Sequence, residues 1–184
     1  RDLHLSIRRQ RQMCIRDSRY TDPRRFGSIH LTNDFKNHFL IKSLGPEPLS
    51  DAFDESYLFK ISRGRKVPIK TLIMNSKIVV GIGNIYACEA LFDSKIKPTK
   101  KAHRISKNEA SALVTSIKKV LKKAIKAGGT TLRDYLNPNS VPGYFKIELR
   151  VYGRGNESCL SCGKILKEIR MNNRSTVFCS SCQR

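Results

Sequence analysis

Four of the six cysteines are spaced as metal ligands usually are. They stand at Cys159, Cys162, Cys179 and Cys182 in a C-x2-C-x16-C-x2-C pattern, which lies within the spacing range of zinc sites. Four thiolates complete a tetrahedral zinc ion and leave no open position for a substrate, so we predict one structural zinc ion. A pair of disulfides is the alternative, but no secretory signal is present and paired two-residue spacings favour metal binding.

Two further groups have residue types suited to phosphate. Gly81, Gly83 and Asn84 meet at a predicted helix start, where unpaired N–H groups can face an anion. A tight turn is the plainer interpretation. Arg174 stands near the predicted tip of a hairpin between the cysteine pairs, where the default role is a solvated turn residue.

Arg24, Arg25 and Phe26 combine two cations with an aromatic ring inside the turn Asp22–Gly27. Such a group can bind phosphates and wedge the ring between bases. A hairpin turn with a buried Phe explains the same residues equally well.

Charge narrows the class of partner. The chain has 36 Lys and Arg against 15 Asp and Glu, a net charge of +21 over 184 residues. So basic a protein is expected to bind polyanions, of which nucleic acid is the commonest. No apolar run approaches the roughly 18 residues of a spanning helix, which excludes an integral membrane protein.

The elements that must position these residues are mostly helical. Residues 70–77 predict a short helix, and a second helix opens at Asn84, which we expect as its N-cap. Ser106 and Glu109 form a capping box, and Gly128-Gly129 ends the helix that follows.

Extended patterns lie on both sides of the helices. Strand-like runs at residues 19–21 and 28–32 flank the Asp22–Gly27 turn, and residues 144–152 also read as extended. Within the cysteine module, residues 165–170 and 176–178 predict a hairpin around Asn172-Asn173. Residues 1–18 show no periodicity and are expected to be a tag or cloning remnant.

Seven blocks, read in order, resemble formamidopyrimidine-DNA glycosylase over residues 19–184. They are DPRRFG at 22–27, LGPEPL at 44–49, GIGNIYACEALF at 81–92, GGTTLRDY at 128–135, PGYF at 142–145, VYGR at 151–154 and the four-cysteine finger. The resemblance implies an α+β fold: a β-sandwich remnant at 19–45, a helix-two-turn-helix domain at 46–150 and a zinc finger at 151–184.

The resemblance also implies a function and residue roles. That family excises oxidised purines such as 8-oxoguanine and formamidopyrimidines from duplex DNA and nicks the strand at the abasic site. It implies DNA contacts for Arg24, Arg25, Phe26, Arg65, Lys70, Asn84 and Arg174, with Arg174 also serving the final elimination step. The implied protein is a bacterial, cytoplasmic monomer whose partner is duplex DNA carrying an oxidised purine or an abasic site.

The start of the sequence departs from the family pattern. The family uses the α-amine of an N-terminal proline as nucleophile and a following glutamate as general acid, whereas this sequence begins Arg1-Asp2. Lys60, Lys66 and Lys70 are possible but weak substitutes. We therefore expect a truncated copy that binds DNA and cleaves poorly or not at all.

Two other functions fit part of the pattern. A non-catalytic protein that binds damaged DNA would use the same helices and finger, and its mark would be preference for an abasic duplex over intact duplex. An RNA-associated zinc-ribbon protein fits the charge and the cysteines, and would prefer structured RNA.

Overall fold

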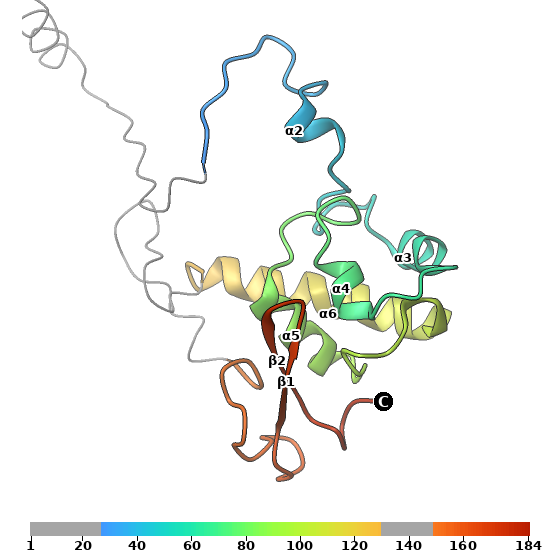
Figure 1. Cartoon of the computed structure of the whole chain (residues 1–184), viewed down its shortest axis with the longest axis vertical. Coiled ribbons are helices and arrows are strands. Elements are labelled where there is room, and N and C mark those ends of the chain that lie inside the picture. Colours follow the sequence, from blue (N-terminus) through green and yellow to red (C-terminus); the bar gives the residue numbers. More distant parts are fainter. Residues whose placement is uncertain (1–26, 130–148) are drawn as a thin grey trace, which may run out of the picture. The chain divides into compact units, whose positions relative to one another are not determined.

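A computed structural model of the protein describes residues 27–129 and 149–184. The chain divides into two units, Arg1–His38 and Phe39–Arg184. Within the described residues, all helices and strands belong to the second unit (Figure 1). In chain order they are α2 Phe39–Lys42, α3 Glu55–Ser62, α4 Ile69–Ile73, α5 Asn84–Asp93, the 3-10 turn η1 Ala102–Arg104, α6 Lys107–Lys126, β1 Lys167–Met171 and β2 Arg174–Phe178.

The capping box at the start of α6 is confirmed. The Ser106 hydroxyl accepts a hydrogen bond from the Glu109 backbone N–H at 3.1 Å, and the Glu109 carboxylate accepts one from the Ser106 N–H at 2.9 Å. At the other end, Gly128 and Gly129 have φ angles of 74° and 91°, a region that glycine enters without steric cost. The predicted start and stop of this helix are therefore both correct.

Loss of the cap should destabilise the helical core. Ser106→Ala leaves the Glu109 N–H without its acceptor, and we expect a loss of about 1 kcal/mol in the free energy of unfolding. Urea denaturation followed by circular dichroism measures it. Ser111→Ala, at an exposed position within α6, is the matched control and should change stability little. Equal effects of the two substitutions would contradict a capping role.

Two features of the other helices differ from the prediction. Helix α3 was not predicted from the sequence, because it buries only Leu58 and Ser62 and so lacks a strong apolar periodicity. Its cap is Asp54, whose Oδ1 accepts from the Tyr57 N–H at 2.7 Å. Helix α5 begins at Asn84, but its N-cap is Gly83, because the Asn84 side chain bonds to other elements.

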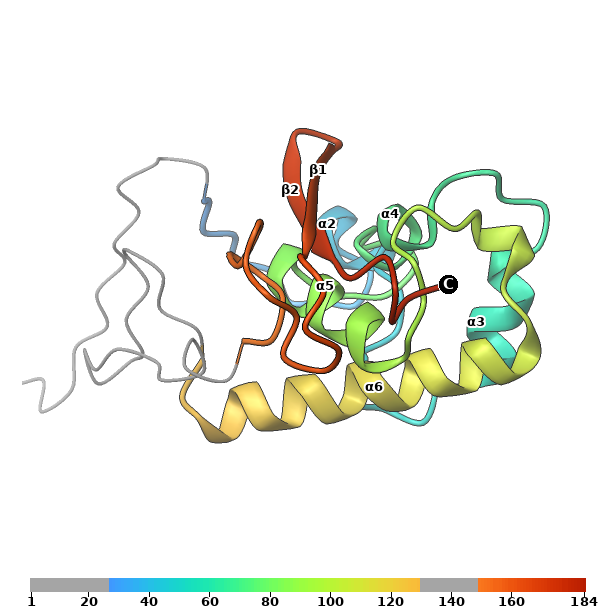
Figure 2. The same ribbon diagram turned by 90° about the horizontal axis from the view of Figure 1, so that it is seen from below.

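Helix α5 lies between α6 and the β1–β2 hairpin (Figures 1 and 2). One face contributes Ala87, Ala90 and Leu91 to the main core, while Cys88 and Phe92 pack into a smaller core with the finger. The main core is built from buried residues of α3 to α6, including Leu58, Ile69, Leu72, Ile73, Leu113, Ile117 and Leu121. None of the described helices is long and apolar enough to cross a membrane.

The finger contains the predicted hairpin. Strands β1 and β2 pair antiparallel in a register that sets Met171 opposite Arg174. Asn172 and Asn173 form the turn with φ angles of 49° and 58°, as a two-residue type I′ turn requires. Together with the helices, this finger confirms the predicted α+β combination of a helical domain and a zinc module.

The predicted strand at residues 28–32 is wrong. These residues have no regular structure, and β1–β2 is the only strand pair in the described ranges. A strand needs a partner to satisfy its backbone groups, and residues 27–45 contain only α2. The remaining part of the expected sandwich remnant, with Arg24, Arg25 and Phe26, lies outside the described residues, as do residues 130–148.

Candidate metal centre and nucleic-acid interface

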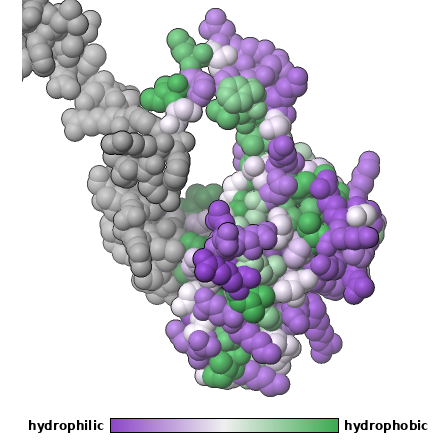
Figure 3. Space-filling model, viewed as in Figure 1, coloured by the Kyte–Doolittle hydropathy of each residue, from purple (hydrophilic) through white to green (hydrophobic). Residues whose placement is uncertain are grey.

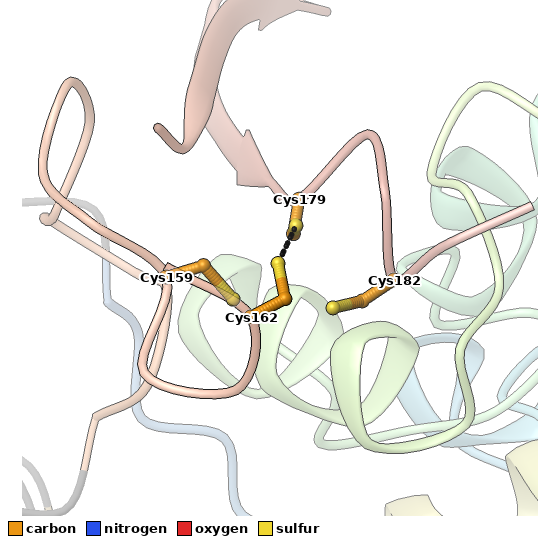
Figure 4. Close-up of side chains that lie close together, drawn as sticks. All are labelled: Cys159, Cys162, Cys179 and Cys182. Carbon is orange, nitrogen blue, oxygen red and sulfur yellow. Dashed lines mark hydrogen bonds between the residues drawn. The ribbon is translucent and has the colours of Figure 1, made fainter. Parts of the chain in front are cut away.

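The four cysteines converge on one point. Cys159 and Cys162 come from the loop before β1, and Cys179 and Cys182 follow β2, so two short turns face each other (Figure 4). Their Sγ atoms all lie within 4.8 Å of one another, and those of Cys162 and Cys179 are 3.5 Å apart. None of the described cysteines forms a disulfide.

This arrangement fits a tetrahedral zinc ion. Zn–S bonds of about 2.3 Å place sulfur atoms about 3.8 Å apart, close to the spacing found here. The other thiols, Cys162 first, raise the pKa of Cys182 to about 12, and a bound cation opposes this effect because it favours the thiolate. The four cysteines are therefore the ligands of one structural metal ion, as predicted.

Hydrogen bonds join the C-terminal end of the finger to the helical domain. The Gln183 side chain accepts from the Cys179 N–H at 2.9 Å and donates to the Ile96 carbonyl at 2.8 Å. The Arg184 backbone bonds to Lys95 and to Lys97 at 3.0 and 2.9 Å. Metal binding at Cys179 and Cys182 thus also fixes the loop that follows α5.

A buried carboxylate fastens the beginning of the finger. Glu89, on α5, is 4% exposed and accepts backbone N–H bonds from Arg150, Val151 and Tyr152 at 2.8–3.0 Å. The sequence analysis missed this residue. An acidic residue among the apolar residues of α5 could have indicated it, because a buried carboxylate is rarely found without a hydrogen-bond partner.

A polar network joins α4, α5 and β2. The Lys70 Nζ donates to the Asn84 Oδ1 at 2.6 Å, to the Thr176 Oγ1 at 2.6 Å and to the Ser175 carbonyl at 3.3 Å. The Asn84 Nδ2 donates to the same Ser175 carbonyl at 2.9 Å. The structure thus brings together two residues that the sequence analysis selected and two, Ser175 and Thr176, that it missed.

Lys70 is 2% exposed. Burial lowers the pKa of its amine, and the charge of Arg174 acts in the same direction, while the neighbouring Cys88 thiol opposes them. Among the described residues Lys70 forms no ion pair with a carboxylate, so its charge adds to the positive potential of this region. Such a position favours an incoming anion.

A cavity of about 320 Å³ opens beside this network. It is lined by Lys70, Thr71, Met74, Asn75, Met171, Asn172 and Arg174. Arg174 is exposed at the first position of β2, and the Asn172 Nδ2 donates to the Thr71 Oγ1 at 3.2 Å, which ties the hairpin turn to α4. Figure 3 shows mainly hydrophilic side chains over the hairpin on this face.

Gly83 leaves room at the start of α5. Its φ angle of −84° is open to any residue, and a Cβ added there would meet nothing within 4 Å. The fold therefore does not require glycine at this position, and the space allows a ligand to approach the backbone N–H groups of the first helical turn. Gly81 differs, because its φ of 74° does favour glycine.

The remaining predicted contact lies apart from this cavity. Arg65 is exposed in the loop after α3, where its Nε donates to the Ile61 carbonyl at 2.8 Å. It does not line the cavity that Lys70 and Arg174 share.

Family models match both parts of the second unit. The formamidopyrimidine-DNA glycosylase H2TH domain matches residues 44–135, and the zinc finger found in FPG and IleRS matches residues 156–184. These ranges contain Lys70 and Asn84 in the first case, and Arg174 with all four cysteines in the second.

Curated relatives extend the similarity. The chain is 60% identical over 166 residues to formamidopyrimidine-DNA glycosylase of Marinomonas sp. (strain MWYL1), covering 90% of this chain and 61% of that protein. It is 53% identical over 167 residues to the enzyme of the same name from Saccharophagus degradans, covering 90% and 62%. The chain thus spans less than two thirds of the length of these relatives.

Solved structures agree with the sequence comparison. MutM (Fpg) protein from Thermus thermophilus superimposes with a TM-score of 0.81 at 37% identity, covering 88% of this chain and 62% of that one. Lactococcus lactis Fpg in complex with DNA containing an abasic site gives 0.73 at 38% identity, covering 79% and 54%.

Proposed function

This chain belongs to the formamidopyrimidine-DNA glycosylase family, and on that premise we propose that it binds duplex DNA at oxidised purines and abasic sites in base-excision repair. The cavity beside Lys70, Asn84 and Arg174 carries this proposal. The exposed Arg174 guanidinium lines this cavity, and the buried Lys70 joins it to Asn84 at the open start of α5. A guanidinium and free helix N–H groups together suit one phosphate of a DNA backbone. A chromosomal DNA partner places the protein in the bacterial cytoplasm.

The family reaction has two chemical steps that we also assign by proposal. The first is excision of the damaged base, such as 8-oxoguanine, and the second is strand cleavage at the resulting abasic site, with Arg174 serving the elimination. Lys70 is the one lysine that lines the cavity in the described part of the chain, and its three hydrogen bonds occupy its amine. A Schiff-base nucleophile must be unprotonated and free to attack, so we assign the covalent step to an amine outside the described residues.

Binding is tested by gel shift on three labelled probes of equal length: an abasic-site duplex, an intact duplex and a structured RNA. We expect the abasic duplex to bind most tightly. Preference for RNA would favour the RNA-associated alternative, and equal binding of both duplexes would reduce the function to general DNA coating. Borohydride trapping on the abasic duplex tests the chemistry, since it captures a Schiff base as a covalent adduct.

Arg174→Ala should weaken binding to the abasic duplex about ten-fold, because a charged hydrogen bond to phosphate is lost. It should also reduce the slope of log affinity against log salt by about 0.9, since one phosphate is no longer neutralised. Lys167→Ala, an exposed cation at the far end of the same hairpin, is the control. An unchanged slope for Arg174→Ala would contradict a phosphate contact.

A further inference from the structure

The side-chain amide of Asn84 has two unlike ends. Its oxygen repels a phosphate, whereas its N–H groups attract one. Both ends are held by groups that can bond in only one way. The Lys70 ammonium can only donate, so the atom 2.6 Å from it must be Oδ1, and the Ser175 carbonyl can only accept, so the atom 2.9 Å from it must be Nδ2.

A flipped amide would be strongly disfavoured here. It would place an NH₂ group against the Lys70 ammonium and a carbonyl oxygen against the Ser175 carbonyl. In the observed orientation, the second Nδ2 hydrogen has no acceptor among the described residues. Asn84 is half-buried at the first position of α5, so this hydrogen is left for a ligand.

Lys70 is itself held firmly. The hydroxyl of Thr176, which is fully buried, accepts from Nζ at 2.6 Å, and the Ser175 carbonyl accepts at 3.3 Å. A lysine buried without a carboxylate partner is costly. We therefore expect the Lys70 ammonium to have a role that an apolar side chain of similar length could not fill.

We propose that Lys70 is a positioning residue that fixes the Asn84 amide with its N–H toward the DNA phosphate, and does not contact DNA itself. The inference rests on the proposed DNA-binding function and differs from the sequence-based assignment of Lys70 as a DNA contact. Through Ser175, the same lysine also holds the residue next to Arg174.

A double-mutant cycle tests the proposal with the full zinc-loaded chain. The probe is a fluorescent duplex with one tetrahydrofuran abasic site. Lys70→Met and Asn84→Ala should each weaken binding about ten-fold, because each removes the same directed N–H contact. In the Asn84→Ala background, Lys70→Met should cost less than about two-fold. Multiplying effects, to about a hundred-fold in the double variant, would overturn the proposal.

Salt dependence separates positioning from direct contact. If Lys70 only directs Asn84, Lys70→Met leaves the slope of log affinity against log salt unchanged. A slope smaller by about 0.9 would show that Lys70 neutralises a phosphate and would overturn the proposal. Lys107→Met, at the exposed start of α6, is the matched control for loss of a lysine charge.

Two further measurements cover the cases in which the variants or the function fail. If Lys70→Met does not fold, Thr176→Val removes the hydroxyl that accepts from the Lys70 Nζ and should also weaken binding.

The Asn84 side-chain NH₂ signals in NMR report the orientation of this amide without DNA. They should lose protection from hydrogen exchange in Lys70→Met, and unchanged protection overturns the proposal. A wild-type chain that fails to bind abasic DNA refutes the proposed function instead.

Discussion

Removal of the metal from Cys159, Cys162, Cys179 and Cys182 will unfold the finger and weaken binding to an abasic-site duplex on the order of 100-fold. The finger has few buried apolar residues of its own, chiefly Val151, Leu166 and Val177, and a lone two-stranded hairpin is at best marginally stable. Structural zinc supplies most of the folding free energy of such modules.

The loss of affinity follows from what the hairpin holds. Lys70 and Asn84 are hydrogen-bonded to Thr176 and Ser175 of β2, and Arg174 of the same strand lines the cavity. Unfolding of β2 therefore removes the bonds that hold Lys70 and Asn84 and displaces Arg174 from the cavity. Loss of a charged phosphate contact and of one directed amide contact amounts to about 3 kcal/mol, which is about 100-fold in affinity. The helical core of α3 to α6 should remain folded, because its own apolar core is extensive.

Chelation followed by hydrogen-exchange mass spectrometry and gel shift measures both effects. Residues 150–184 should lose protection while residues 107–126 keep it, and added zinc should restore both protection and binding. Cys159→Ser should reproduce the loss. Cys88→Ala, which removes a buried thiol outside the metal site, should retain one zinc ion per chain. A metal-free chain with a protected hairpin and full affinity would show that apolar packing alone holds the finger.

The sequence was informative where structure is dictated locally. The cysteine spacing, the Ser106–Glu109 capping box and the Asn172-Asn173 turn each depend on residues close together in the chain, and all three are confirmed. Helix α3 was missed because its apolar face is short. The strand at residues 28–32 was wrong because its pattern matches a strand while no described segment pairs with it.

The polar networks between elements could not be predicted. Lys70 and Thr176 are 106 positions apart, and nothing in their local sequences indicates that they meet. The resemblance selected Lys70 and Asn84 as separate DNA contacts, but only the fold shows that the two side chains are hydrogen-bonded to each other. Long-range contacts of this kind depend on how α4, α5 and β2 pack together, which periodicity does not encode.

Glu89→Ala will lower the free energy of unfolding by about 3 kcal/mol and detach the finger from α5. The carboxylate is buried, and its three acceptor contacts satisfy the backbone N–H groups of Arg150, Val151 and Tyr152. Without it the buried Val151 N–H and the part-buried N–H groups of Arg150 and Tyr152 lose their acceptor, and each fully buried group of this kind costs about 1–3 kcal/mol before the structure relaxes. Because the bonds to Glu89 lie only a few residues before Cys159, the first metal ligand, the orientation of the finger should change as well.

Glu89→Gln provides a graded comparison within the same site. One carboxylate oxygen accepts from both Val151 and Tyr152, and the other accepts from Arg150 alone. A glutamine can therefore keep two of the three bonds by turning its oxygen toward Val151 and Tyr152, at the loss of about 1 kcal/mol. Urea denaturation should rank stability as wild type, Glu89→Gln, then Glu89→Ala, with zinc content unchanged in the glutamine variant. Equal stability of the alanine and glutamine variants would mean that the negative charge, rather than the acceptor geometry, holds the finger against α5.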